Sequence, residues 1–369
     1  MAARRAAVAG MALRMRVLVT GHRGYIGSIL TPMLSGRGHE VVGCDVGLYE
    51  DCSFAGELSP VPNLPRDIRV LTAADVAGFD AVIHLAGLSN DPLGNYEPQL
   101  TYAINHHATV RLAGLAVGAG VRRFLFASSC SVYGSATEEM LNEESAINPV
   151  TPYGVSKARA EEELSSLAGE HFSPTYIRAG TVYGVSPRIR FDLVLNNLVA
   201  WAASTGAVRL KSDGRSFRPL VHVSDVARAY CALLEAPRDL IHDEAFNAGR
   251  TRENFRIQEL AGIVQRTVPG SRIEYSNEAT ADRRNYRVDC GKIQSRIEGF
   301  EPCWDALRGA GELHAALHAR PVAPDDFEGP AFSRIAHVRR LIADGRLSED
   351  LYWRAGPAAD TTSSADRRA

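Results

Sequence analysis

The chain has 369 residues, of which 45% are hydrophobic and 23% charged, and its formal net charge is −2. This composition predicts a soluble globular protein with a substantial core. The near-neutral balance indicates no nucleic-acid partner, and no run of about 18 apolar residues predicts a membrane helix. Six cysteines occur without a Cys-x-x-Cys pair, which argues against a zinc or other metal site and a disulfide framework and favours a reducing, cytoplasmic compartment.

The two ends of the chain differ from its middle. We expect residues 1–14 to be a disordered extension, with later methionines as alternative starts, because Arg14 and Arg16 interrupt an apolar stretch that otherwise resembles a signal peptide. Residues 356–369 are mostly small and polar, and we expect a disordered tail there.

Between these ends, short apolar runs alternate with helical patterns, which is typical of a parallel sheet flanked by helices. We expect strands, in chain order, at 16–20, 40–44, 69–71, 81–85, 124–127 and 175–178. Helices are expected over 25–36, 99–119 and 153–169. Gly118 and Gly120 mark the end of the second helix, as glycine commonly does.

A glycine-rich turn, Gly21-His-Arg-Gly24-Tyr25-Ile26-Gly27, joins the first strand to the first helix. Glycines permit a tight bend and a close approach to a diphosphate, and the helix start offers free N–H groups. Asp45 follows the second strand 18 residues after Gly27, where a carboxylate binds two ribose hydroxyls and repels a 2′-phosphate. A plain turn and a solvated loop acid are the alternatives. The combination predicts that the cofactor is NAD.

These features together predict an α/β fold of Rossmann type, a doubly wound parallel sheet. We assign residues 15–180 to this NAD-binding domain, with a return segment at about 219–250. Residues 181–355 show a less regular pattern, and we expect them to form mainly a smaller mixed α/β substrate-binding domain.

Tyr153 and Lys157 stand four residues apart on the expected helix 153–169. Residues at this spacing share one helix face. A phenol titrates near ~10, and a nearby ammonium stabilises phenolate, so Tyr153 becomes a usable base. Only three lysines stand against 38 arginines in this chain, so a lysine at this place calls for an explanation. The pattern alone also arises by chance on amphipathic helices.

With these residues, the chain resembles the extended short-chain dehydrogenase/reductases, specifically the NAD-dependent nucleotide-sugar epimerase/dehydratase group, over roughly residues 15–300. Asp67 and Ile68 match the pair that contacts adenine in this family. His84-Leu85-Ala86-Gly87 matches the segment that lies along the cofactor. Three further segments carry the resemblance: Phe126–Gly134, Asn148–Gly154 and Arg218–Asp225.

The resemblance places Ser129 where the family has its catalytic serine or threonine, beside Tyr153 and Lys157, whereas Ser128 is expected to be structural. Dehydratases of the family typically carry acidic residues at the next two positions. This chain has Cys130 and Ser131 there. Some epimerases place a cysteine at the second position, so Cys130, at the first, is interpreted as a packing residue.

The remaining chemistry resembles that of nucleotide-sugar 4-epimerases, in which a 4-keto sugar forms, turns over and is reduced again while NAD stays bound. Three hypotheses stay open. The first is such a 4-epimerase. The second is a ketoreductase or an atypical dehydratase acting on nucleotide sugars. The third is a non-catalytic nucleotide-sensing scaffold, because folds are reused without their chemistry.

The resemblance also implies which residues bind the substrate. Arg218 and Arg284, or its neighbour Arg283, are expected to hold the diphosphate through forked donors, although a surface ion pair is the alternative for each. Thr181 stands where well-known 4-epimerases have an asparagine, which predicts altered sugar recognition. Further candidates for sugar or phosphate contacts are Ser89, Asn90, Asn196 and Asn197.

Relatives that pair through a four-helix bundle imply a homodimer through the helices at 99–119 and 153–169. No membrane or nucleic-acid partner is expected. Residues 332–344 form an amphipathic helical pattern beyond the family's usual core, and the sequence assigns it no role.

Overall fold

The computed structural model describes residues 14–54, 56–89, 97–280 and 285–354. Its centre is a seven-stranded sheet in the order β11-β7-β5-β4-β1-β2-β3, in which every neighbouring pair is parallel. The strands are β1 (Arg16–Thr20), β2 (Glu40–Cys44), β3 (Asn63–Leu64), β4 (Ala81–His84), β5 (Arg123–Ser129), β7 (Ser173–Ala179) and β11 (Glu244–Ala248).

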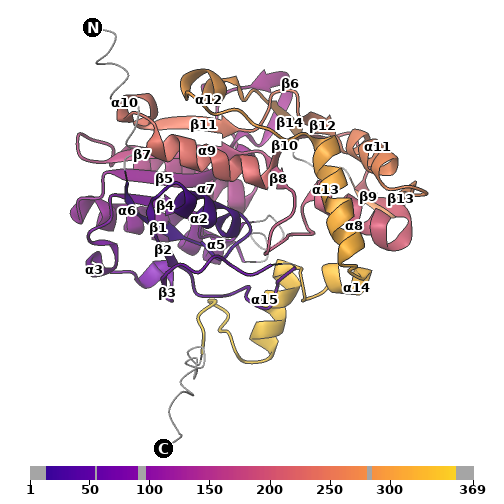
Figure 1. Ribbon diagram of the computed structural model, residues 1–369, viewed down its shortest axis with the longest axis horizontal. Coiled ribbons are helices and arrows are strands. Elements are labelled where there is room, and N and C mark those ends of the chain that lie inside the picture. The colour runs from indigo at the N-terminus through magenta and orange to yellow at the C-terminus, as the bar shows by residue number, and fades with distance from the viewer. Residues whose placement is uncertain (1–13, 55, 90–96, 281–284, 355–369) are drawn as a thin grey trace, which may run out of the picture.

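Helices cover both faces of this sheet, which explains why its inner strands are apolar on both sides (Figure 1). One face packs against α2 (Gly27–Gly36), α9 (Val223–Glu235) and α12 (Gly291–Arg296), with the short α10 (Arg238–Ile241) nearby. The other face packs against η1 (Ile68–Val70), α3 (Ala73–Val76), α5 (Pro98–Tyr102), the π-helical segment η2 (Ala103–His107), α6 (Ala108–Gly118) and α7 (Pro152–Ser165).

The order of the strands reverses between β1 and β4, because the chain adds β2 and β3 on one side of β1 and all later strands on the other. In a parallel sheet this reversal opens a crevice at the carboxyl ends of the strands. The fold is therefore of the doubly wound, Rossmann-like type, as the sequence predicts.

A second group of elements packs beside the sheet around its own apolar core, on the right of Figure 1. Its helices are α8 (Val194–Thr205), α11 (Ile257–Thr267), α13 (Ala306–Ala319) and α14 (Pro324–Phe327). Its strands form two small sheets: β8 (Thr181–Tyr183), β10 (Phe217–His222) and β12 (Asn254–Arg256) in one, β9 (Ala207–Ser212) and β13 (Arg272–Thr280) in the other. Next to them lie η3 (Cys130–Tyr133) and the pair β6 (Ser135–Leu141) and β14 (Asn285–Val288).

The last helix, α15 (Arg334–Ala343), returns to the large sheet. Its Val338 and Leu341 are buried in the same core as η1 and α6. The segment that follows is fastened by Trp353, whose indole Nε1 donates to the carbonyl of Val46 at 2.9 Å. The amphipathic pattern at 332–344 thus marks a helix that packs on the sheet domain.

The first two strands, Ala81–His84 and the three long helices lie close to their predicted positions. The strand predicted at 69–71 is wrong. Asp67 accepts a hydrogen bond from the backbone N–H of Arg69 at 2.8 Å and starts the 3₁₀ turn η1. The edge strand is instead β3, which pairs with the end of β2. β11 joins the large sheet, whereas β10 pairs with β8. The domain boundaries remain a prediction, and the two predicted disordered ends lie outside the described residues apart from Arg14.

Leu341 tests whether α15 belongs to the core. Its side chain is fully buried, so Leu341→Ala leaves a cavity and is expected to lower the free energy of unfolding by about 2 to 5 kcal/mol. Arg340→Ala, at an exposed position on the same helix, is expected to change it by no more than about 0.5 kcal/mol. Denaturant unfolding measures both. Equal values for the two variants would show that α15 does not contribute to the folded core.

Candidate active site

A cavity of about 970 Å³ lies at the carboxyl ends of the central strands and extends towards the second group of elements. Its wall contains the glycine turn, the end of β5, the start of α7, the chain after β8 and the start of α15. All the predicted cofactor residues line it: Gly21, Gly24, Tyr25, Ile26, Gly27, Asp45, Asp67, Ile68, Leu85, Ala86, Gly87, Tyr153 and Lys157.

The glycine turn can be built only from glycine at two of its positions. Gly21 has φ of +72°, and a Cβ there would lie 2.7 Å from the backbone nitrogen of Ala86. A Cβ on Gly27 would lie 2.5 Å from the carbonyl oxygen of Gly21. The turn therefore presses against the end of β4 and places the N-terminus of α2 beside the cavity. This arrangement suits a diphosphate.

Asp45 follows β2 at the rim of this turn. Its carboxylate accepts hydrogen bonds from the backbone N–H groups of Arg23 at 3.1 Å and Gly47 at 2.9 Å. These contacts fix the carboxylate while its half-buried side chain still lines the cavity. Asp67 lines the cavity as well, and both its oxygens are bound by Arg69.

Tyr25 connects the glycine turn to the second group of elements. Its hydroxyl donates to the carbonyl of Gly184 at 2.7 Å and accepts from the amide of Asn196 at 3.2 Å. Burial raises the pKa of this phenol, so Tyr25 stays neutral and serves as a hydrogen-bonding link.

Tyr153 and Lys157 share one face at the start of α7, as their spacing predicts. Thr151 caps this helix by accepting from the N–H of Gly154 at 3.1 Å, and Pro152 occupies its first turn. The ammonium of Lys157 lies 5.8 Å from the ring centre of Tyr153 and 4.6 Å from that of Phe126. Burial lowers the pKa of Lys157 to about 7, against a raising contribution from Glu161.

Ser129 ends β5 on the wall of the same cavity. Its hydroxyl accepts from the N–H of Ser131 at 3.1 Å and donates to the hydroxyl of Ser131 at the same distance. Cys130, between them, points the other way. Its thiol donates to the carbonyl of Arg178 at 3.2 Å and packs in a small buried cluster with Tyr133. Cys130 does not line the cavity, so its packing role agrees with the structure.

A buried ion pair supports this end of the site from behind. Arg178 Nη2 donates to Glu161 Oε2 at 2.5 Å, and its Nε donates to the other oxygen at 3.0 Å. The same carboxylate accepts from the hydroxyl of Ser128. Ser128 is thus tied to α7 and holds the end of β5 against the helix that carries Tyr153.

The substrate candidates fall into three sets. Ser89, Thr181, Asn197 and Arg218 line the cavity. Asn196 does not, because its amide is occupied by Gly184, Tyr25 and the carbonyl of Arg190. Arg284, Arg283 and Asn90 lie outside the described residues. The roles of all these residues remain predictions.

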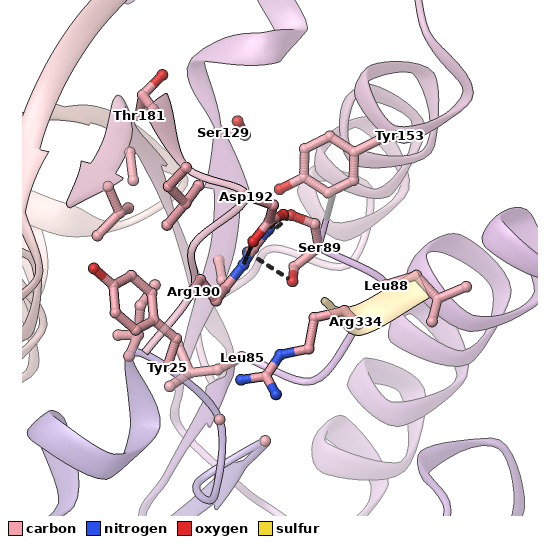
Figure 2. Close-up of a pocket in the computed structure, with 18 of the residues that line it drawn as sticks. Tyr25, Leu85, Leu88, Ser89, Ser129, Tyr153, Thr181, Arg190, Asp192 and Arg334 are labelled. Atoms are coloured by element: carbon pink, nitrogen blue, oxygen red, sulfur yellow. Dashed lines mark hydrogen bonds and ion pairs between the residues drawn. The ribbon is translucent and has the colours of Figure 1, made fainter. Parts of the chain in front are cut away.

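The cavity residues that were not identified from the sequence include three charged ones, Arg190, Asp192 and Arg334. Figure 2 shows Arg190 between Tyr25 and Tyr153, with its guanidinium bound to Asp192 and Ser89. Arg190 Nη2 lies 2.6 Å from Asp192 Oδ2, and its Nη1 lies 3.0 Å from the hydroxyl of Ser89. The third, Arg334, comes from α15. A clue existed in the arginine-rich run at 188–190, but arginine is so common in this chain that the run did not stand out.

Comparison with known proteins agrees with this geometry. The model of the NAD dependent epimerase/dehydratase family matches residues 17–249. The chain belongs to this family.

Similar proteins include UDP-glucuronic acid decarboxylase 1 of Arabidopsis thaliana, 28% identical over 86% of this chain and 73% of that protein. UDP-glucose 4-epimerase of Bacillus subtilis (strain 168) is 27% identical over 82% of this chain and 95% of that protein. The solved structure of MoeE5 in complex with UDP-glucuronic acid and NAD matches with a TM-score of 0.71 and 28% identity, covering 82% of this chain and 99% of that one.

The cofactor of this epimerase/dehydratase family member is NAD. The residues fit it, because the turn at Gly21–Gly27 leaves room for a diphosphate and Asp45 offers a carboxylate at the ribose position. The family comprises enzymes that act on nucleotide sugars as epimerases, dehydratases or decarboxylases. None of the described helices combines the length and apolar character needed to cross a lipid bilayer.

Burial of Lys157 makes the stability of the cofactor-free protein depend on pH. Between pH 7 and 10.5 the unfolded chain holds a proton on Lys157 that the folded chain has lost. Stability therefore rises with pH in this window, by at most about 1.4 kcal/mol per unit, relative to a variant without the amine. We expect the wild type to gain stability over Lys157→Met between pH 7 and 9 in denaturant unfolding.

The exposed Lys211 supplies the control, because Lys211→Met removes an ammonium that is 59% exposed. The stability difference between wild type and this variant is expected to stay flat over the same range. A flat difference for Lys157→Met as well would show that the folded protein keeps Lys157 protonated.

Proposed function

We propose that the protein is an NAD-dependent epimerase of a nucleotide-diphosphate sugar, acting at C4 through a transient 4-keto sugar. The observation that carries the proposal is the environment of Ser129. Tyr153, Lys157 and Ser129 line one cavity with the glycine turn, while Cys130, at a position where dehydratases of the family carry an acid, is turned into the core.

The three residues have distinct roles in this proposal. Tyr153 accepts the proton of the C4 hydroxyl, and Ser129 hydrogen-bonds the same oxygen and relays the proton. Lys157 in its ammonium form favours the phenolate of Tyr153, and that phenolate in turn stabilises the ammonium against the effect of burial. When bound, NAD supplies the acceptance and return of a hydride at C4. The keto sugar then rotates in the cleft and presents its opposite face to the returning hydride, which inverts the configuration at C4.

The described part of the cavity wall offers no second acid suited to eliminating water. Asp192 lines it, but Arg190 binds both of its oxygens, and Asp192 in turn raises the pKa of Arg190 against the lowering effect of burial. A carboxylate held in this way is a poor proton donor. Within the described part of the wall, the remaining acids are Asp45 and Asp67, at the cofactor end, and Glu328.

Substrate binding in the proposal uses the residues that line the far part of the cavity. Arg218, whose guanidinium is buried, holds the diphosphate, with Arg284 as the second donor. Ser89, Thr181 and Asn197 contact the sugar or the phosphates. Thr181 offers a hydroxyl in place of an amide, which favours a sugar other than the common hexoses.

A decarboxylase or dehydratase is the second candidate, favoured by the similarity to UDP-glucuronic acid decarboxylase 1. A ketoreductase that consumes NADH remains a further alternative. A non-catalytic scaffold is the least favoured, because Ser129, Tyr153 and Lys157 are all present on the cavity wall.

Incubation with a panel of nucleotide sugars in D₂O, without added cofactor, tests the reaction type by NMR and mass spectrometry. We expect a C4 epimer without deuterium at C4, because the hydride does not exchange with solvent. Deuterium at C3 or C5 would indicate enolisation. Loss of water would indicate a dehydratase, and loss of CO₂ a decarboxylase. Turnover only when NADH accompanies a keto sugar would indicate a ketoreductase. Any of these results would contradict the epimerase proposal.

Two substitutions test the assigned roles. Tyr153→Phe removes the proton acceptor and is expected to lower kcat by roughly 10²- to 10⁴-fold, while NAD remains bound. Cys130→Ala, one position from Ser129 but outside the cavity, is expected to leave kcat within a few-fold. A loss of activity in Cys130→Ala at unchanged stability would indicate that Cys130 takes part in the reaction.

We also propose a cytoplasmic homodimer that pairs through α5 to α6 and α7. These helices pack against one another on one face of the large sheet. Light scattering on the purified protein measures its mass, and a monomer at micromolar concentration would exclude this assembly.

A further inference from the structure

Two buried arginines meet near the glycine turn. Arg188 follows β8 and is 7% exposed, and Arg334 begins α15 and is 4% exposed. Arg334 Nη2 donates to the backbone carbonyl of Arg188 at 3.1 Å, and its guanidinium lies 4.4 Å from the ring centre of Tyr49. In the described part of the chain, Arg188 Nε and Arg334 Nη1 are buried without a hydrogen-bond partner.

Neither guanidinium forms an ion pair with a described carboxylate, although other buried arginines of this protein do. Arg178 pairs with Glu161, and Arg190 pairs with Asp192. Burial and the nearby charge of Arg334 lower the pKa of Arg188. Two adjacent buried cations with unpaired N–H groups are unfavourable unless an anion joins them.

The thiol of Cys52 and the carboxylate of Asp45 are the protein groups that oppose the lowered pKa of Arg188. Burial raises the pKa of the Cys52 thiol, although Arg334 opposes this effect. Cys52 therefore stays a neutral thiol near pH 7 and does not balance the two arginines. The carboxylate of Asp45 is bound by the backbone N–H groups of Arg23 and Gly47, and it forms no ion pair with either arginine in the described part of the chain. A ligand anion would complete the pair of arginines.

The location of Arg334 indicates which ligand this is. Arg334 lines the cavity together with Tyr49, Asp45 and the glycine turn. Figure 2 shows its guanidinium on the side of Tyr25 and Leu85, away from Ser129 and Thr181. The anion therefore belongs to the cofactor end of the cavity, where the N-terminus of α2 also favours negative charge.

We propose that Arg334, supported by Arg188, binds the diphosphate of NAD from the side opposite the glycine turn. In this arrangement α15 covers the cofactor. The backbone N–H groups of the turn and the guanidinium of Arg334 then hold the same diphosphate between them. The inference rests on NAD as cofactor and is independent of the reaction at the sugar.

The segment that carries Arg334 is fixed to the NAD-binding side at three points. His337 Nε2 is hydrogen-bonded to the carbonyl of Leu48 at 3.0 Å, and Arg69 Nη1 donates to the carbonyl of Asp350 at 2.7 Å. Trp353 donates to Val46, next to Asp45. The guanidinium is therefore held in place before NAD binds, which reduces the entropy lost on binding.

Three variants test the proposal. Arg334→Gln removes the charge, Arg334→Lys keeps a charge without the fork, and Arg340→Gln removes an exposed charge from the same helix. For Arg334→Gln we expect at least a tenfold higher Kd for NADH and ADP-ribose, unchanged binding of adenosine, and at least tenfold faster release of NADH in a fluorescence chase. The Kd values and the NADH release rate of Arg334→Lys are expected to lie between those of the wild type and Arg334→Gln. Those of Arg340→Gln are expected to match the wild type.

The melting temperature separates a ligand role from a structural one. Because Arg334 carries an uncompensated buried charge, cofactor-free Arg334→Gln is expected to melt no lower than the wild type, while the shift produced by 1 mM NAD shrinks. A lower melting temperature with an unchanged NAD shift would overturn the proposal.

Two other sources of the anion are distinguished by the choice of probe. Weaker binding of UDP, dTDP or GDP with unchanged ADP-ribose binding would assign Arg334 to the diphosphate of the sugar nucleotide and overturn the proposal. Weaker binding of NADPH alone would assign it to a 2′-phosphate, with the same consequence.

Discussion

The close approach of Gly21 to the backbone of Ala86 determines where the rest of the site lies. A single Cβ at Gly21 would come within 2.7 Å of that backbone, so the turn can lie against the end of β4 only because it carries no side chain there. From this contact the N-terminus of α2 faces the crevice between β1 and β4. The cofactor cradle, and the distance from it to Tyr153, follow from this placement.

Buried cations at the site occur in two environments, with and without a paired carboxylate. Where a cation supports the fold, as Arg178 does, a carboxylate binds its Nε and Nη2 groups together. Lys157 lines the cavity without such a pair among the described residues, and burial lowers its pKa to about 7. Arg334 also lines the cavity with an N–H group that has no partner among the described residues, and Arg188 lies beside it, whereas Arg190 on the same wall is paired with Asp192. Unbalanced charge on the wall therefore marks the positions where a ligand completes the structure.

Much of this site could be predicted from the sequence because its geometry is local. The spacing of Tyr153 and Lys157 corresponds to one helical turn, and the glycine turn joins a strand to the helix that follows it. Asn196 could not be excluded from the cavity in this way, because its amide is bound by Tyr25, 171 residues earlier in the chain. The strand predicted at 69–71 failed for a related reason: the side chain of Asp67 competes with sheet pairing by capping a turn.

Arg334 was beyond prediction from sequence because nothing local connects it to the glycine turn, more than 300 residues away. Its position also bears on the reaction. An enzyme that regenerates NAD in every cycle gains by holding it, whereas a reductase must exchange its cofactor at each turnover. In the proposed arrangement the diphosphate is enclosed between the glycine turn and Arg334, beneath a helix whose Leu341 is fully buried, and this enclosure would favour retention of NAD. The proposed contact of Arg334 thus favours a reaction that regenerates NAD over a reductase, whichever carbon of the sugar reacts.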